Sequence, residues 1–128
     1  MRLLKHATFA VLATLALSSS AGMVTTEYVT FFSEGPSKMA TGSLRDARDS
    51  GDSLQYIGCS MDVHLNGNIY TGCAAQDSDG NLLYCESNNY HETGAMQTIN
   101  SASVISFSVT TDGQCFGVTT ITGSDLLP

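Results

Sequence analysis

The sequence predicts a small all-β domain: an antiparallel sheet or sandwich of five to six strands, with hairpin turns, one short helix and two disulfides. Three observations support this prediction. Runs rich in β-branched and aromatic residues recur along the chain. Asn-Gly or Asp-Gly pairs separate several of these runs. Four cysteines in only 128 residues are typical of a small exported domain that disulfides stabilise.

The first 21 residues have the features of a secretory signal peptide. Arg2 and Lys5 give a positively charged start, residues 7–17 are mostly apolar, and small residues at 18–21 suit a cleavage after Ala21. The apolar run is shorter than the roughly 20 residues that a membrane-spanning helix needs. We therefore expect residues 22–128 to form a single mature domain that is secreted or periplasmic.

The balance of charges narrows the classes of partner. The whole chain has 5 Lys and Arg against 12 Asp and Glu, a net charge of −7. Without the signal peptide the net charge becomes −9, because only Lys38, Arg45 and Arg48 face the twelve carboxylates. Nucleic acids and anionic membranes are bound through clustered Lys and Arg. The composition therefore argues against both as partners, and no second apolar run predicts a membrane span.

The N-terminal part of the mature domain is predicted to contain one strand and a long loop. Residues 24–32 are rich in Val, Thr and aromatic residues and predict a first strand, which Gly35-Pro36 ends. The segment 33–53 is polar and contains all three mature cations, so we expect a loop with about one helical turn. Ser43, followed three residues later by Asp46, is suited to cap that turn.

From residue 54 onward, strands and tight turns alternate. Strands are expected at 54–63, 68–75, 82–87, 104–110 and 114–122. The turns that end in Asn-Gly or Asp-Gly, a strong hairpin pattern, lie at 65–67, 78–80 and 111–113. The longest gap, 88–102, predicts a short helix, because Asn89 and Glu92 have the spacing of a helix cap.

A short motif occurs twice in this region. Tyr56-Ile57-Gly58-Cys59 is followed 14 residues later by Tyr70-Thr71-Gly72-Cys73. A duplicated binding motif is one interpretation. We favour the other, in which two adjacent strands meet the same packing demands, since so few residues do not establish a repeat architecture.

The hairpin turns also predict how the cysteines pair. If each turn is a three-residue loop with a G1 bulge, Cys59 lies opposite Cys73, and Cys73 lies opposite Cys85. Cys59 and Cys85 are then roughly 9–10 Å apart, beyond disulfide reach. Cys59 and Cys73 form the non-hydrogen-bonded pair, in which side chains are closer, so we expect Cys59–Cys73 and Cys85–Cys115. Cys73–Cys85 with Cys59–Cys115 remains the alternative.

Motifs for catalysis or metal binding are weak. Apart from the signal peptide, the chain has two histidines, His64 and His91, and no G-x-S-x-G elbow accompanies them. Residues 77–81 resemble the start of a calcium loop, but position 88 is Asn where the loop needs Glu. A hairpin turn explains the segment fully. We expect no metal and no cofactor.

The most distinctive polar surface is expected between residues 45 and 52, which contain two of the three mature cations. The candidate binding residues are Arg45, Asp46, Arg48, Asp49, Asp52 and His91. We expect a non-enzymatic binding or structural role toward an extracellular protein or surface component, as an inhibitor or in adhesion. The alternatives are a small secreted hydrolase that uses carboxylates around 46–52 or His91, and a weak calcium-binding extracellular module.

Overall fold

A computed structural model describes residues 24–88 and 90–127. The predicted signal peptide and the predicted helix cap Asn89 lie outside these residues. The described elements follow in the order β1 (Thr30–Glu34), β2 (Ser37–Ser43), α1 (Leu44–Arg48), β3 (Tyr56–Val63), β4 (Ile69–Gln76), β5 (Leu82–Ser87), α2 (Tyr90–Met96), β6 (Ser103–Val109), β7 (Cys115–Thr122) and the short 3-10 helix η1 (Ser124–Leu126).

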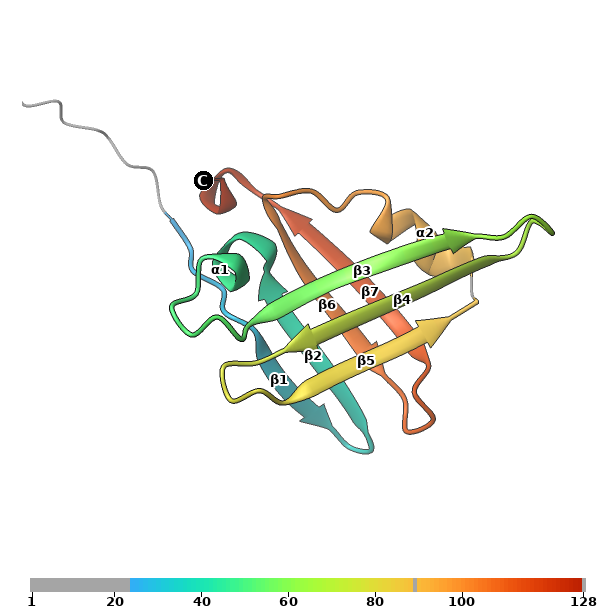
Figure 1. The fold of residues 1–128 in the computed structure, drawn as a ribbon, viewed down its shortest axis with the longest axis horizontal. Coiled ribbons are helices and arrows are strands. Elements are labelled where there is room, and N and C mark those ends of the chain that lie inside the picture. Colours follow the sequence, from blue (N-terminus) through green and yellow to red (C-terminus); the bar gives the residue numbers. More distant parts are fainter. Residues whose placement is uncertain (1–23, 89, 128) are drawn as a thin grey trace, which may run out of the picture.

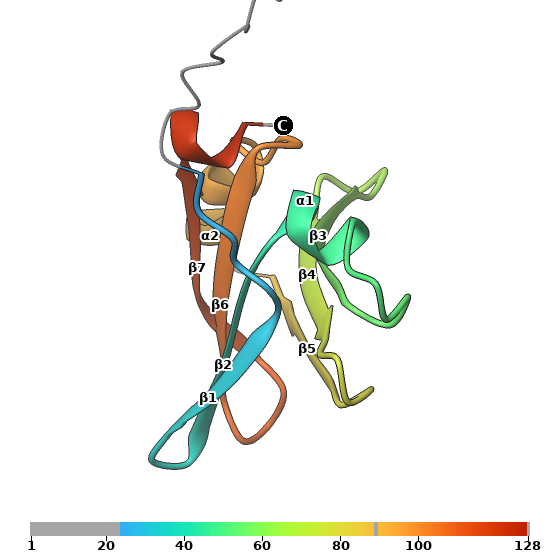
Figure 2. The same cartoon turned by 90° about the vertical axis from the view of Figure 1, so that its left-hand side faces the viewer.

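The strands form two antiparallel sheets packed face to face (Figures 1 and 2). One sheet has the strand order β1-β2-β6-β7 and the other the order β3-β4-β5. The three-stranded sheet lies in front in Figure 1, and its strands cross those of the sheet behind it at a large angle. The predicted all-β class is confirmed, with seven strands where five to six were expected.

The five strands predicted from residue 54 onward all form, each within two residues of its expected bounds. The three hairpin turns share one geometry, the three-residue loop with a G1 bulge. In the first, His64 N–H donates to Asn68 O at 2.9 Å and Gly67 N–H donates to His64 O at 2.9 Å. The closing glycine has a φ of +82 to +83° in all three turns, a region that favours glycine.

The structure differs from the prediction between residues 24 and 43. The first strand begins only at Thr30, so a strand from residue 24 was wrong. Two N–H groups before it bond to side chains: Glu27 N–H donates to Asp46 Oδ2 at 2.7 Å, and Val29 N–H donates to Gln55 Oε1 at 2.8 Å. Glu27 O accepts Ser43 N–H, at the end of β2, at 2.8 Å. For the two N–H groups, side chains of α1 and of the following loop therefore take the place of a neighbouring strand.

The loop expected over residues 33–53 was also wrong in part, because β2 occupies residues 37–43. This segment is polar and has little β-propensity of its own. It is a strand because it pairs with β1 on one side and β6 on the other. A Cβ on Gly42 would lie 3.0 Å from Val29 Cγ2, so a larger residue there would require the buried Val29 to move.

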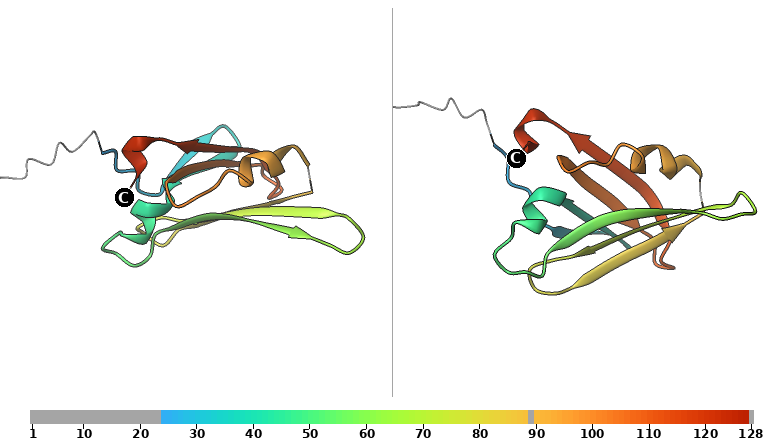
Figure 3. Two further views of the ribbon diagram at one scale, coloured as in Figure 1. Left: turned by 90° about the horizontal axis from the view of Figure 1, so that it is seen from above. Right: turned by 45° about the horizontal axis from the view of Figure 1, so that its top comes forward.

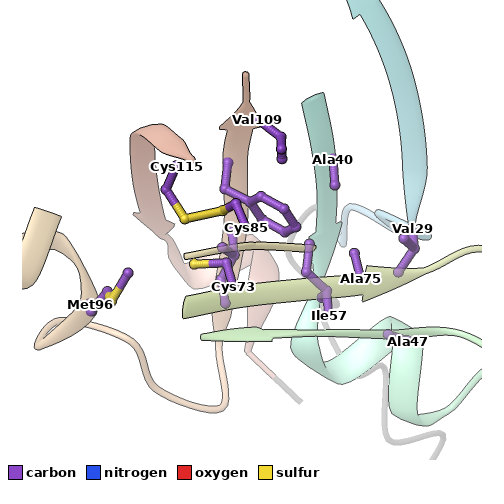
Figure 4. Packing of buried hydrophobic residues seen from close by; sticks show 12 residues of the cluster. Val29, Ala40, Ala47, Ile57, Cys73, Ala75, Cys85, Met96, Val109 and Cys115 are labelled. Carbon is purple, nitrogen blue, oxygen red and sulfur yellow. A yellow bond between two sulfur atoms is a disulfide. The ribbon is translucent and has the colours of Figure 1, made fainter. Parts of the chain in front are cut away.

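The core lies between the two sheets (Figure 4). Ile105 and Phe107 from β6 are fully buried, and Ile57 and Ala75 reach them from the three-stranded sheet. Both predicted disulfides form: Cys59–Cys73 joins β3 to β4, and Cys85–Cys115 joins the two sheets through this core. The expected register, with Cys73 opposite both Cys59 and Cys85, is confirmed.

Candidate functional site

The predicted charged surface at residues 45–52 divides into a buried and an exposed part. Arg45 and Asp46 are both buried in α1. Arg45 Nε donates to Asp46 Oδ1 at 2.8 Å, and its two terminal nitrogens donate to Leu127 O at 2.7 Å and Thr25 O at 2.9 Å. The pair therefore holds the two terminal segments of the described chain against α1, at one end of the molecule (Figure 1).

The electrostatics of this pair suit a permanent internal contact. Burial raises the pKa of Asp46, but hydrogen bonds from Arg45, from Glu27 N–H and from the cap at Ser43 together bring it below its usual value. Ser43 Oγ accepts the N–H of Asp46 at 3.2 Å, which confirms the predicted helix cap. Arg45 and Asp46 are thus charged and fully engaged within the chain, which is a structural role.

The exposed part of the stretch also binds mainly to itself. Arg48 and Asp49 form an ion pair on the surface, with Nε and Oδ1 2.8 Å apart. Asp52 accepts hydrogen bonds from Leu54 N–H, Gln55 N–H and Gln55 Nε2, at 2.6 to 3.0 Å. These bonds hold the loop that leads into β3, where Gln55 in turn accepts Val29 N–H.

Of the two histidines, the structure describes the side chain of His64. His91 lies in α2, and its side chain is outside the described residues. His64 packs edge-on against Tyr70, with 4.8 Å between ring centroids. Among the described side chains, Arg45–Asp46 and Arg48–Asp49 are the ion pairs, and no group of three or more His, Cys, Asp or Glu is placed to hold a metal ion.

Sequence reasoning missed a different surface, the outer face of the three-stranded sheet. Side chains alternate along each strand, so the cysteines point toward the core and their neighbours point outward. Tyr56, Tyr70 and Tyr84 are 54%, 44% and 62% exposed on this outer face. No described element lies over it, as the view from above in Figure 3 shows. We call this surface the tyrosine face.

A shallow groove crosses the tyrosine face. Its floor is made of small residues, because Gly58 lies opposite Ala74 and Ser60 lies opposite Gly72 in the strand pairing. Two depressions, of about 230 and 400 Å³, meet at Ser60, Gly72 and Glu86. The smaller one is flanked by Tyr56 and Tyr84, and the larger one by Tyr70 and Asp62.

The duplicated motif supplies much of this face. Cys59 pairs with Cys73, so the two copies run in opposite directions from their disulfide. Tyr56 and Tyr70 therefore lie toward opposite ends of the face, each with a glycine two residues nearer the centre. A Cβ on Gly58 would lie 2.7 Å from the Tyr56 hydroxyl, so this glycine lets the ring lie flat over the sheet.

The spacing of the motif predicts which of its side chains share one side of the sheet, although not whether that side is covered. Tyrosine and glycine two residues apart share one side of a strand, and cysteine takes the other side. The cysteine side of the motif thus packs against the core, and its tyrosine side forms an exposed aromatic surface.

The groove is acidic. Asp62 and Glu86 line the larger depression, and Glu86 also borders the smaller one. Neither depression has a Lys or Arg among its described lining residues. The cations of the described chain lie elsewhere, Lys38 on β2 and both arginines in α1.

Comparisons of the chain with protein-family models, curated proteins and solved structures find no match. Within residues 24–88 and 90–127, no helix is both long and apolar enough to cross a membrane. Two disulfides are typical of proteins that mature in an oxidising compartment. The surface of the chain is therefore the main evidence that bears on its function.

Proposed function

We propose that the protein is a secreted, non-enzymatic binding protein whose partner docks on the tyrosine face. The observation that supports this most directly is the exposure of Tyr56, Tyr70 and Tyr84 on one uncovered sheet face. Aromatic side chains, tyrosine above all, are enriched at protein interfaces, where a large apolar ring and a polar tip both find contacts.

The backbone beneath the tyrosines is well suited to present them. Cys59–Cys73 crosslinks β3 to β4 directly below the groove, and Cys85–Cys115 ties β5 to the other sheet. A tyrosine side chain has few rotatable bonds, so it loses little conformational entropy when a partner binds and orders it. A rigid face of this kind serves adhesion to an extracellular component and inhibition of an extracellular enzyme equally well.

Export is part of the proposal and has two supports. The first 21 residues have the charge and apolar pattern of a signal peptide. All four cysteines are paired, and none is free, which suits an oxidising compartment.

The test is capture of partners from the extracellular fraction of the source by immobilised protein. Tyr70→Ser combined with Tyr84→Ser is expected to weaken capture at least 10-fold, because truncation of aromatic anchor residues removes much of the binding energy of an interface. The matched control combines Phe32→Ser and Phe116→Ser, which remove exposed aromatic rings from the four-stranded sheet.

Circular dichroism and thermal unfolding establish that both double variants are folded. Capture that survives in the Tyr70→Ser/Tyr84→Ser variant, or that falls equally in the control, overturns the tyrosine face as the binding site. Absence of any captured component from the wild-type protein counts against a binding role.

A further inference from the structure

Building on the proposed function, we infer that the tyrosine face takes an extended, positively charged peptide segment of a partner protein. Three features of the groove point to this chemistry: its carboxylates, its aromatic rings and its length.

The charge of the face is complementary to a basic segment. Asp62 lies at one end of the groove and Glu86 lies where its two depressions meet, and the turn after β4 places Asp77 and Asp79 beyond the other end. Asp77 is held in its turn by Asn81, whereas Asp79 is exposed at the tip of the turn. The described chain has three cations against twelve carboxylates, so its overall field also attracts a cationic partner.

The cations of the described chain do not neutralise Asp62 and Glu86. Arg45 and Arg48 are paired with Asp46 and Asp49. Lys38, on β2, lines one depression with Asp77 and another with Tyr84, and neither depression includes Asp62 or Glu86. Asp62 and Glu86 have no ion-pair partner among the described residues. A bound Lys or Arg side chain would supply the missing positive charge.

The tyrosines suit the same ligand. An ammonium or guanidinium group over a tyrosine ring is attracted by the negative face of the ring, within about 6 Å of its centre. The aliphatic stems of Lys and Arg also pack well on apolar rings. Tyr70 shares the larger depression with Asp62 and Glu86, so a ring and two carboxylates there surround one volume of about 400 Å³.

The shape of the groove fits an extended segment. The two depressions follow β3 from Tyr56 to Asp62, a distance of about 20 Å at roughly 3.3 Å per strand residue. An extended peptide of about six residues has the same length. The floor of Gly72 and Ala74 leaves room for a peptide backbone to approach the sheet closely, beside the Tyr56 ring over Gly58.

The probe is the hexapeptide (Arg-Gly)3, with the neutral hexapeptide (Gln-Gly)3 as its counterpart. Binding is followed by calorimetry and by tyrosine fluorescence, which has no tryptophan background in this protein. We expect (Arg-Gly)3 to bind, (Gln-Gly)3 not to bind, and the affinity to fall as salt is raised from 0.05 to 0.5 M (roughly a threefold shorter screening length).

Two pairs of variants separate the groove from general attraction to an acidic protein. Asp62→Asn with Glu86→Gln is expected to weaken (Arg-Gly)3 binding at least 10-fold. Glu34→Gln with Asp49→Asn removes the same charge away from the groove and is expected to change binding less than 3-fold. Equal weakening in both pairs, or no binding of (Arg-Gly)3 to the wild-type protein, overturns the basic-peptide inference.

The same experiment distinguishes this inference from the proposed function. If Tyr70→Ser/Tyr84→Ser abolishes capture of the natural partner while (Arg-Gly)3 does not bind, the binding face stands and the partner chemistry is wrong. A neutral oligosaccharide that binds in place of (Arg-Gly)3 likewise overturns the basic-peptide inference and leaves the binding face in place. If neither capture nor (Arg-Gly)3 binding responds to the tyrosine variants, both proposals are wrong.

Discussion

The charged side chains between residues 45 and 52 stabilise the fold through hydrogen bonds and ion pairs within the chain. Arg45 and Asp46 are buried, a placement that costs desolvation free energy. That cost is offset because the guanidinium also donates to Leu127 O and Thr25 O, and the carboxylate accepts Glu27 N–H. Asp52, in contrast, is exposed and organises a loop through several short hydrogen bonds.

Asp52 makes the stability of the protein depend on acid. Hydrogen bonds from Gln55 and from Leu54 N–H lower its pKa from 3.8 to about 2. A carboxylate with a lowered pKa in the folded state stabilises the protein above its unfolded pKa, and this contribution is lost as pH falls through the folded pKa. We therefore expect the stability difference between wild type and Asp52→Asn to be constant above about pH 5 and to shrink between pH 4 and pH 2.

Urea unfolding of both proteins at several pH values measures this difference. Parallel stability curves for wild type and Asp52→Asn from pH 5 to pH 2 would contradict the assignment, because Asp52 would then titrate alike in the folded and unfolded chains.

Among the elements, the hairpin turns are those whose geometry follows most clearly from their own residues. The loops after β3, β4 and β6 each close with a hydrogen-bonded pair and a glycine at positive φ. This geometry sets the strand register, and the register places Cys59, Cys73 and Cys85 in one row. A one-residue slip would move every core side chain of a strand to the solvent.

Gly113 and Gly117 test this cause. No heavy atom lies within 4 Å of a Cβ added at either position, so contacts alone do not distinguish them. Gly113 has a φ of +82°, whereas Gly117 has no positive φ. Gly113→Ala is therefore expected to destabilise the protein by about 1–2 kcal/mol, and Gly117→Ala to leave it unchanged or slightly more stable.

Thermal and urea unfolding of the two single variants give the comparison. Equal stability of the two proteins would show that the backbone at Gly113 tolerates a left-handed alanine and that the turn has another cause.

The whole molecule depends on how its two sheets are joined. Cys85–Cys115 links positions 30 residues apart and connects the sheets, whereas Cys59–Cys73 links adjacent strands across 14 residues. Cys85 and Cys115 are also buried in the core, next to the side chains of β6. The Cys85–Cys115 disulfide thus closes the longer loop, and both of its cysteines fill core volume.

Removal of Cys85–Cys115 is therefore expected to destabilise the protein more than removal of Cys59–Cys73. By loop entropy, Cys59→Ala/Cys73→Ala costs about 3 kcal/mol and Cys85→Ala/Cys115→Ala about 4 kcal/mol. Lost core volume adds to both costs, and more to the second, because Cys85 and Cys115 are both buried whereas only Cys73 of the other pair is. Urea unfolding of the two double variants measures both values. A larger loss for the Cys59–Cys73 bridge would contradict the role of Cys85–Cys115 as the main link between the sheets.

The sequence predicts correctly the part of the fold that hydrogen bonds between nearby residues determine. Asn-Gly and Asp-Gly turns and β-rich runs predicted β3 to β7 and the register of β3, β4 and β5. That register favoured the two observed disulfides over the alternative pairing of Cys73 with Cys85. Ser43 and Asp46 likewise specified the start of α1. These features involve residues close in sequence, whose geometry follows from their own backbone preferences.

Only the tertiary structure decided the rest. The polar segment 37–43 is a strand because β6, more than 60 residues away, supplies its partner, and Arg45 is buried because both terminal segments meet over it. The tyrosine face is exposed because no described element packs on the outer side of β3, β4 and β5. The pairing of distant strands and the burial of a sheet face depend on complementary surfaces that lie far apart in sequence. No local pattern of residues determines either of them.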